Sequence, residues 1–364
     1  RSFRCSQFYS ALSKITKCLM NSGLSKFWYK LTHWEYWPFG VLYFPVYFYF
    51  TWLIIRCRSF YFFTAANPKI DFGGMLGERK KEIFDLIPQH YLPQFSLISA
   101  GDLGAADKAA KTLKFPLICK PDIGERGNLV EVIDSTDALN NYVSKCPVPF
   151  LMQEFVEYPI ELGVFYIKIP GQEKGRITSI VQKDFLHVIG DGTSCIKKLL
   201  EQSTRAILQL DFDHPRFTEK LKTVPQKGEK VVVEPIGNHC RGTQFMDQTR
   251  QITPALNEAF NTLADEIEGF YFGRFDLRCA SFADLERLEN FKILELNGAG
   301  AEPGHIYQPG FSLWKGYQSI LWHLKQLAKV SRANHKKGVK YWTFREGITK
   351  MQAIKAYNRI AQKK

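Results

Sequence analysis

Alternating hydrophobic and polar residues in the last quarter of the chain predict two short β-strands that carry acidic side chains. The first strand lies within GRFDLR (273–278) and the second within KILELNGAG (292–300). Successive side chains of a strand point to opposite faces, so Glu295 and Asn297 share one face. We expect the two strands to be neighbours, which would bring Asp276 to that same face.

These three side chains place oxygen donors in otherwise apolar strands. Burying such donors is costly unless a positive charge lies among them. Carboxylate and amide oxygens, without His or Cys, suit Mg²⁺ that is shared with nucleotide phosphates. The sequence therefore predicts metal ligands at Asp276, Glu295 and Asn297. A single acid of this kind would have a simpler explanation, as a polar residue at the end of an edge strand.

Two segments with helical periodicity lie earlier in the chain, before the apolar run at 115–133. The pattern predicts a helix over 78–87, which Pro88 ends, and an Ala-rich helix over 102–114. Asp102 stands at the start of the second helix, where its carboxylate can cap the first free amides. These segments read as ordinary α+β structure ahead of the apolar run.

The apolar run, FPLICKPDIGERGNLVEVI (115–133), predicts two strands joined by a glycine-containing loop. The first strand ends at Lys120, and the loop contains Gly124 and Gly127. A lysine beside a flexible loop can hold phosphates between its charge and the backbone amides. The spacing is not that of a Walker loop. A plain hairpin with a surface lysine fits the same residues.

Two glutamates seven residues apart follow this hairpin. Glu154, in FLMQEFV (150–156), lies at the end of one predicted apolar strand, and Glu161, in IELGVFYIK (160–168), lies at the start of the next. A hinge between two strands offers backbone N–H and C=O groups to an adenine edge, and a nearby carboxylate can bond ribose hydroxyls. Each glutamate taken singly is better explained as solvated charge.

The N-terminal part is dense in aromatic residues and has no formal charge from position 37 to 55. As a helix this stretch would be roughly 28 Å long, close to the thickness of a bilayer core. Pro38 and Pro45 are expected to interrupt it, and Trp and Tyr favour the headgroup boundary. We favour an in-plane or re-entrant membrane anchor, ahead of a single span and of an aromatic layer packed on the body.

The net charge of +13 is concentrated at the two ends. The first 63 residues carry eight Lys or Arg and one acid, and the last 50 carry thirteen and one, so the middle has a net charge of −6. Basic ends on a mildly acidic body predict an anionic membrane surface as partner and no nucleic acid. Eight scattered cysteines without a C-x-x-C pair argue against zinc and favour reduced thiols in the cytosol.

Taken in order, these motifs resemble the ATP-grasp superfamily. The order is a lysine strand with a glycine loop, a strand ending in Glu, a second Glu, and then R-x-D … E-x-N. The runs HVIGDGTSCIKKLL (187–200) and VPQKGEKVVV … RGTQFMDQT (224–249) are similar to the branch that contains D-alanine–D-alanine ligases and cyanophycin synthetases. The resemblance covers residues 75–325 and implies an α+β fold of two lobes with ATP between them, preceded by the aromatic, membrane-associated segment.

The resemblance also implies a role for individual residues. Lys120 would contact the α-phosphate, Lys80 would be the earlier nucleotide lysine, and Lys183 a weaker third one. ATP would also contact the glycine loop, the hinge and the adenine pocket, through Gly124, Gly127, Glu154, Phe155, Val156, Glu161 and Leu294. Two Mg²⁺ ions, with Mn²⁺ as an alternative, would be held by Asp276, Glu295 and Asn297.

The implied chemistry is ligation of a carboxylate to an amine through an acylphosphate. Both steps develop negative charge on oxygen, so fixed cations matter more than a protein nucleophile. Arg274, which shares a strand face with Asp276, is the first candidate for this role, and Arg241 the second. Each arginine has a structural ion pair as its alternative. An ATP-grasp kinase and a non-catalytic nucleotide-binding membrane module remain competing functions.

Departures from the family affect the substrate pockets and spare the ATP site. Arg126 stands where D-alanine–D-alanine ligases have a serine, and GAGAEPGHIY (298–307) replaces their usual turn. The substrates are therefore expected to be an amino acid, a peptide or a lipid-linked compound, with Arg126 as a substrate contact. We expect the protein in the cytoplasm, peripheral to or anchored at the inner face of the cell membrane.

The predicted organisation has five parts. They are a membrane-associated segment (1–63), a small region before the ATP-grasp part (64–115), an N-lobe (116–210), a C-lobe (211–330) and a basic tail (331–364).

Overall fold

The computed structural model describes residues 23–362, apart from 125–126, 211, 213–216 and 238–241. The chain forms two compact units. The smaller comprises Arg1–Phe44, Asp184–Gln244 and Gln308–Leu313, and the larger comprises Pro45–Lys183, Phe245–Tyr307 and Trp314–Lys364. The larger unit contains strands from both predicted lobes. The predicted division into five parts stays a prediction.

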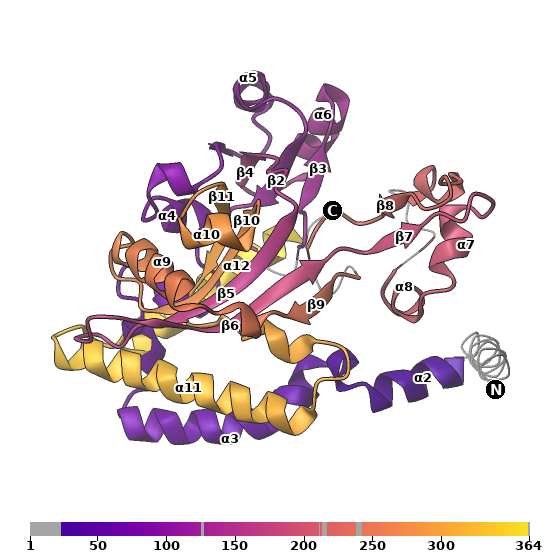
Figure 1. Cartoon of the computed structure of the whole chain (residues 1–364). Coiled ribbons are helices and arrows are strands. Elements are labelled where there is room, and N and C mark those ends of the chain that lie inside the picture. The colour runs from indigo at the N-terminus through magenta and orange to yellow at the C-terminus, as the bar shows by residue number, and fades with distance from the viewer. Residues whose placement is uncertain (1–22, 125–126, 211, 213–216, 238–241, 363–364) are drawn as a thin grey trace, which may run out of the picture. The chain divides into compact units, whose positions relative to one another are not determined.

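The first sheet of the larger unit has four strands in the order β1-β4-β2-β3 (Figure 1). Its strands are β1 (Phe95–Ile98), β2 (Leu117–Pro121), β3 (Glu131–Ile133) and β4 (Phe150–Glu154), all in antiparallel pairs. Helices α5 (Leu103–Leu113) and α6 (Thr136–Lys145) share a hydrophobic core with this sheet. The Asp102 carboxylate accepts from the Ala105 amide, so the predicted cap and helix are confirmed.

The second sheet has the order β11-β10-β5-β6-β9. Its strands are β5 (Ile160–Ile167), β6 (Arg176–Asp184), β9 (Gln244–Asp247), β10 (Phe272–Cys279) and β11 (Phe291–Asn297). Residues Phe275 and Leu277 of β10 lie in a core that includes side chains of α9 (Pro254–Asp265). Because side chains alternate along a strand, Arg274, Asp276 and Arg278 occupy the opposite face of β10.

Helix α4 is shorter than the sequence predicts, running over Lys80–Phe84 rather than 78–87. Asp122, distant in sequence, accepts from the first amides: its carbonyl from Lys80 N and its carboxylate from Lys81 N, both at 2.9 Å. The following turn is tighter, because Ile87 N donates to Phe84 O, three residues back. The chain then reaches Pro88 without another α-helical turn.

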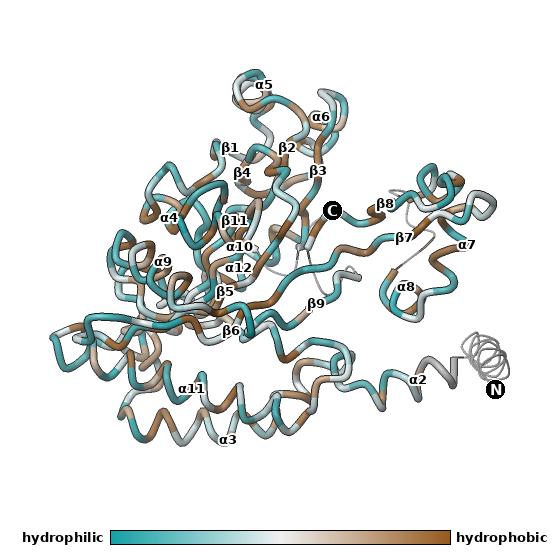
Figure 2. Tube along the Cα trace, viewed as in Figure 1, coloured by the Kyte–Doolittle hydropathy of each residue, from teal (hydrophilic) through white to brown (hydrophobic). Residues whose placement is uncertain are grey.

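Helices α3 (Phe39–Cys57) and α11 (Leu313–Lys336) lie side by side (Figure 1). Leu53 and Cys57 of α3 share a core with Leu327 and Val330 of α11. Among the described residues, α3 alone is long and apolar enough to cross a membrane, by length and composition only. Brown, hydrophobic segments run along it in Figure 2. Pro45 lies inside this helix, so the expectation that it interrupts the helix is wrong.

The predicted basic tail contains α12 (Phe344–Ala361), which belongs to the larger unit. A capping box at Thr343 and Glu346 begins the helix. Lys350 Nζ donates to the Asp71 carboxylate and to the Gly77 carbonyl. Tyr357 and Ala361 of this helix lie against the core beneath α5 and α6.

The smaller unit contains a two-stranded sheet, short helices and a core of their own. Its regular elements are α2 (Gly23–Thr32), β7 (His187–Ile189), α7 (Ile196–Leu200), α8 (Thr204–Gln209) and β8 (Lys230–Val232). Leu186, Ile196 and Leu200 are buried in that core. Short 3₁₀ turns complete the two units: Trp34–Tyr36, Phe62–Ala65, Asp71–Gly74, Gln89–Tyr91, Lys220–Lys222, Thr249–Gln251 and Gly304–Tyr307.

Candidate active site

The register between β10 and β11 brings the three predicted metal ligands to one face of the second sheet. Asp276 is the cross-strand partner of Glu295, and Arg274 is the partner of Asn297. Asp276 is buried, whereas the Glu295 side chain is 37% exposed. Cross-strand partners of this kind have Cβ atoms about 5 Å apart. The oxygen atoms therefore gather at one end of the β10–β11 pair.

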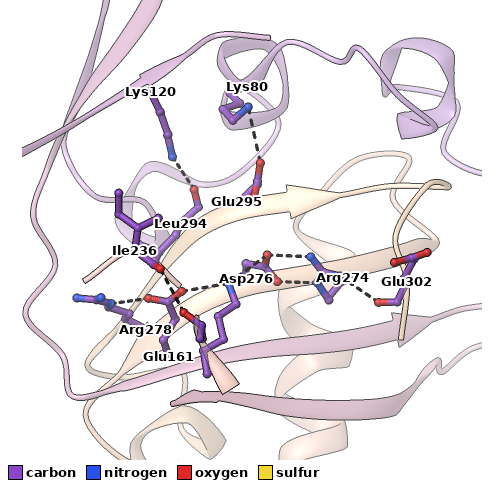
Figure 3. Close-up of polar contacts among 12 residues, drawn as sticks. Lys80, Lys120, Glu161, Ile236, Arg274, Asp276, Arg278, Leu294, Glu295 and Glu302 are labelled. Carbon is purple, nitrogen blue, oxygen red and sulfur yellow. Dashed lines mark hydrogen bonds and ion pairs between the residues drawn. The ribbon is translucent and has the colours of Figure 1, made fainter. Parts of the chain in front are cut away.

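Two lysines reach this face from elements around the first sheet (Figure 3). Lys120 of β2 donates to the Leu294 carbonyl at 2.8 Å. Lys80, at the start of α4, donates to the Gly124 carbonyl at 2.8 Å, and its Nζ lies 3.7 Å from Glu295 Oε1. Both lysines are buried. Two buried ammonium groups thus lie beside the oxygen cluster.

Burial lowers the pKa of Lys120 to about 8, while the carboxylate of Glu295 acts in the opposite direction. A buried ammonium group without a direct carboxylate partner loses hydration that a carbonyl only partly replaces. An anionic ligand beside Lys120 would supply the missing charge. The site is therefore suited to a polyanion such as a triphosphate.

Arg274 holds Asp276 through two parallel hydrogen bonds. Its Nε lies 2.7 Å from Oδ1 and its Nη2 lies 3.0 Å from Oδ2. Nη1 donates to the Glu302 carbonyl at 3.0 Å, which fixes the guanidinium in the plane of the strand face. Burial raises the pKa of Asp276, but Arg274 and Lys183 outweigh it, so the pKa is lowered and the carboxylate stays ionised.

A second group of charges surrounds Glu161. Arg278 Nε donates to Glu161 Oε2 at 2.8 Å and Lys183 Nζ donates to Oε1 at 3.0 Å. Lys183 Nζ also lies 3.5 Å from Asp276 Oδ2. Each carboxylate oxygen of Glu161 therefore already accepts from a cation. A ribose hydroxyl would have to share these oxygens with Lys183 and Arg278.

Arg278 also fixes the predicted adenine hinge. Its Nη1 donates to the Val156 carbonyl at 2.6 Å, and its guanidinium lies 5.3 Å from the centre of the Phe155 ring. Glu154 N donates to the Gln94 carbonyl at 2.9 Å. Sequence reasoning missed Arg278, although the alternation that identified Arg274 and Asp276 places it on the same face.

The oxygen donors fit a hard divalent cation. Asp276 Oδ1 accepts from Arg274 and keeps another lone pair, whereas Oδ2 faces both Arg274 and Lys183. The Glu295 side chain is 37% exposed. The Asn297 Nδ2 atom is buried without a hydrogen-bond partner among the described residues. Bound phosphate oxygens could accept from it, or the amide could turn its oxygen inward. The described part of the chain holds no group of three or more His, Cys, Asp or Glu side chains that could bind a metal. Mg²⁺ prefers octahedral coordination, so the three proposed side chains would leave positions for nucleotide phosphates and water.

The remaining predicted residues are placed as follows. Gly127 has a φ of +70°, in the left-handed region that glycine favours. Leu294 contributes its carbonyl to Lys120. Arg126 and Arg241 lie outside the described residues, so their predicted roles as substrate contact and second catalytic cation stay predictions.

Backbone segments far apart in sequence support the end of β11, which sequence reasoning also missed. Gly300 N donates to the Gly74 carbonyl at 2.8 Å. A Cβ atom on Gly300 would lie 2.1 Å from the Met75 carbonyl oxygen. The Asn67 side chain bonds the backbone of Phe272. The glycines of LELNGAG therefore allow close contact between two backbone segments.

No protein-family model matches the sequence, and no curated protein matches it. Among solved structures, the chain is similar to the D-alanine–D-alanine ligase from Bacillus anthracis, with 13% identity and a TM-score of 0.40 over 71% of this chain and 69% of that one. It is also similar to the VanG D-Ala:D-Ser ligase from Enterococcus faecalis, with 14% identity and a TM-score of 0.40 over 70% and 61%.

A third similar structure is the bifunctional glutathione synthetase from Pasteurella multocida, with 10% identity and a TM-score of 0.31 over 63% of this chain. The chain spans about a third of the length of that enzyme, 34%. The ligases found are of the kind that the sequence motifs indicated. With TM-scores below 0.5, they add nothing to the proposals that follow, which depend on the contacts in Figure 3.

Proposed function

We propose that this protein is an ATP- and Mg²⁺-dependent ligase that joins a carboxylate to an amine. One observation carries the proposal: Asp276, Glu295 and Asn297 share one face of β10 and β11, beside two buried lysines, Lys80 of α4 and Lys120 of β2. Such an arrangement can hold a triphosphate between fixed positive and metal-bearing negative groups.

Bound magnesium would screen the phosphates and draw charge from the γ-phosphate oxygens. Lys80 and Lys120 would neutralise the remaining phosphate charge, and Asp276, Glu295 and Asn297 would hold the metal that binds the triphosphate. The substrate carboxylate attacks the γ-phosphorus, the bond to ADP breaks, and an acylphosphate forms. Catalysis here is positioning and electrostatic stabilisation, with no covalent role for a side chain.

In the second step the amine nitrogen attacks the acyl carbon. A tetrahedral oxyanion forms, phosphate leaves, and the nitrogen gives up a proton. Arg274 is the group proposed to stabilise that oxyanion, because its guanidinium is held rigid by Asp276 and the Glu302 carbonyl. A preorganised cation needs no rearrangement when the charge develops.

The two proposed substrates are a carboxylate and an amine. Each would be an amino acid, a peptide or a lipid-linked compound. We place the reaction at the cytoplasmic face of a membrane, supported by the exposed aromatic residues of α3. Arg126 remains the proposed contact for a substrate carboxylate or phosphate, and Arg241 a second cation of the site.

The test is a substrate screen with the full-length chain, ATP and Mg²⁺, in which ADP and inorganic phosphate are both measured. A ligase releases phosphate in step with ADP only when a carboxylate and an amine are both present. Hydroxylamine would trap the acylphosphate as a hydroxamate. A kinase would form ADP without free phosphate, and a non-catalytic module would form neither, so each of these results would overturn the proposal.

A further inference from the structure

One side of α3 carries a continuous stripe of exposed apolar residues. Their side chains are between 47 and 70% exposed, and they are Val41, Phe44, Phe48, Trp52 and Ile55. Spacings of three and four residues place them on one side of the helix. Phe60 and Phe344 are also exposed, and their ring centroids are 6.1 Å apart. An apolar surface of this kind marks a site of interaction.

The other side of α3 is covered by protein. Leu42, Val46, Leu53 and Cys57 are buried, and the last two share a core with α11. The segment after α3 is tied to α11 by hydrogen bonds: Ser331 Oγ donates to the Phe62 carbonyl, and Asn334 Nδ2 donates to the Ala65 carbonyl at 2.9 Å. If α3 left to cross a bilayer, buried apolar residues of α11 such as Leu327 would meet water.

Helix α3, which carries the stripe, and its neighbour α11 contain basic residues and no acidic ones. No acidic residue occurs from position 36 to 70 or from 303 to 345, the stretches that contain α3 and α11. The same stretches contain exposed cations at Arg56, Lys325 and Lys329. The Arg56 guanidinium lies 5.3 Å from the centre of the Trp52 ring. Aromatic side chains next to cations are typical of the boundary between lipid headgroups and acyl chains.

We infer that the protein docks on an anionic bilayer through the exposed stripe of α3, with the helix in the plane of the membrane and its buried side on α11. This deepens the membrane location proposed above and is independent of the ligase reaction. A second copy of the chain is a poorer occupant, because a symmetric contact would bring the same cations together.

The inference is tested by vesicle binding of the full-length chain. Vesicles with about one third phosphatidylglycerol should bind the protein at least tenfold better than neutral phosphatidylcholine vesicles, and salt should remove the difference, because headgroup attraction is screened. The double variant Phe48→Glu/Ile55→Glu should lose at least tenfold in binding. The matched control is Leu97→Glu/Leu103→Glu. It adds the same two negative charges at exposed apolar residues of β1 and α5, and it should bind vesicles as the wild type does.

The depth at which Trp52 lies in the bilayer distinguishes a helix docked in the plane of the membrane from a membrane-spanning helix. Trp52 fluorescence, taken as the difference from a Trp52→Phe variant, should be quenched by lipids brominated near the headgroup, and alkaline carbonate should release the protein. If Trp52 were instead quenched by lipids brominated deep in the acyl chains, and if carbonate did not release the protein, α3 would span the membrane. That result would overturn the inference. So would unchanged binding by the double variant, or a dimer in solution that the double variant abolishes. Since ADP and phosphate release are measured separately without vesicles, failure here leaves the ligase proposal unaffected.

Discussion

Arg274 and Asp276 lie two residues apart on one face of β10, and the guanidinium of Arg274 bonds both oxygens of the Asp276 carboxylate at 2.7 and 3.0 Å. This pair joins the proposed metal ligand to the proposed oxyanion-stabilising group. A change at either residue therefore affects both. Their neighbours Glu302 and Lys183 fix the pair from its two sides.

Arg274→Ala should lower kcat for amide formation by about 10²- to 10³-fold, because a preorganised cation is lost. Arg274→Lys keeps the charge but loses the paired geometry, and we expect an intermediate rate. The KM for ATP should change much less than kcat. Steady-state kinetics with ADP detection measure both. Wild-type turnover by Arg274→Ala would rule out the assigned role.

Glu295→Gln should raise the Mg²⁺ concentration needed for half-maximal rate at least tenfold, since it removes an exposed carboxylate from the oxygen cluster. Titration of the initial rate with MgCl₂ measures this. Glu302→Gln is the matched control, because the Glu302 carboxylate accepts from the Tyr307 hydroxyl, and the hydrogen bond from Arg274 goes to the backbone carbonyl, which the substitution keeps. An unchanged magnesium requirement in Glu295→Gln would contradict the metal assignment.

ATP binding should weaken above pH 8. Burial lowers the pKa of Lys120 to about 8, so the free site loses this proton as the pH rises through that value. Phosphate favours the protonated lysine, so binding above pH 8 must take up a proton, and affinity should fall up to tenfold per pH unit. Calorimetry from pH 6.5 to 9.5 in buffers of different ionisation enthalpy measures affinity and proton uptake together.

Lys120→Arg should show no such pH dependence, because arginine stays charged throughout this range. Lys120→Met should bind ATP weakly at every pH. If Lys120→Met kept the wild-type pH profile, another group would have to be responsible.

Arg278→Gln should destabilise the protein by roughly 3 kcal/mol, because it removes a buried ion-pair partner of Glu161 and the donor to the Val156 carbonyl. The hinge should also loosen, which raises the KM for ATP more than it changes kcat. Denaturant unfolding and kinetics are the two measurements. Lys292→Gln is a suitable control, because Lys292 is partly exposed and its ammonium group donates to the His90 carbonyl, away from Glu161. A stable variant with unaltered KM would refute the positioning role.

Gly300→Ala should destabilise the protein by about 2 to 3 kcal/mol, since its Cβ would lie 2.1 Å from the Met75 carbonyl oxygen. Thermal unfolding should show a clear fall in Tm. Gly40→Ala is the matched control in α3: nothing lies within 4 Å of its added Cβ, and alanine favours a helix. Equal effects of the two substitutions would disprove the close contact.

The alternation of polar and apolar residues was enough to predict β10, β11 and the shared face of Asp276, Glu295 and Asn297. It worked because the period of two is a local property of a strand. The same alternation could have identified Arg278. Its bond to Glu161, 117 residues away, depends on the pairing of β10 with β5, which local pattern does not specify.

Other features had no local signal at all. The contact of Lys120 with the Leu294 carbonyl joins residues 174 positions apart. The start of α4 is set by Asp122, and the fit of Gly300 against Gly74 involves backbone alone. Pro45 was expected to interrupt the helix over 37–55, yet α3 continues through it as one helix.

Helix α12 has a consequence for how easily the larger unit is digested. Lys350 bonds Asp71 and the Gly77 carbonyl, and Tyr357 and Ala361 cover part of the core beneath α5 and α6. Cleavage between α11 and α12 would therefore allow this cover to come away and leave apolar side chains of that core in contact with water. A nick at this one place should make the rest of the larger unit a better substrate for proteases.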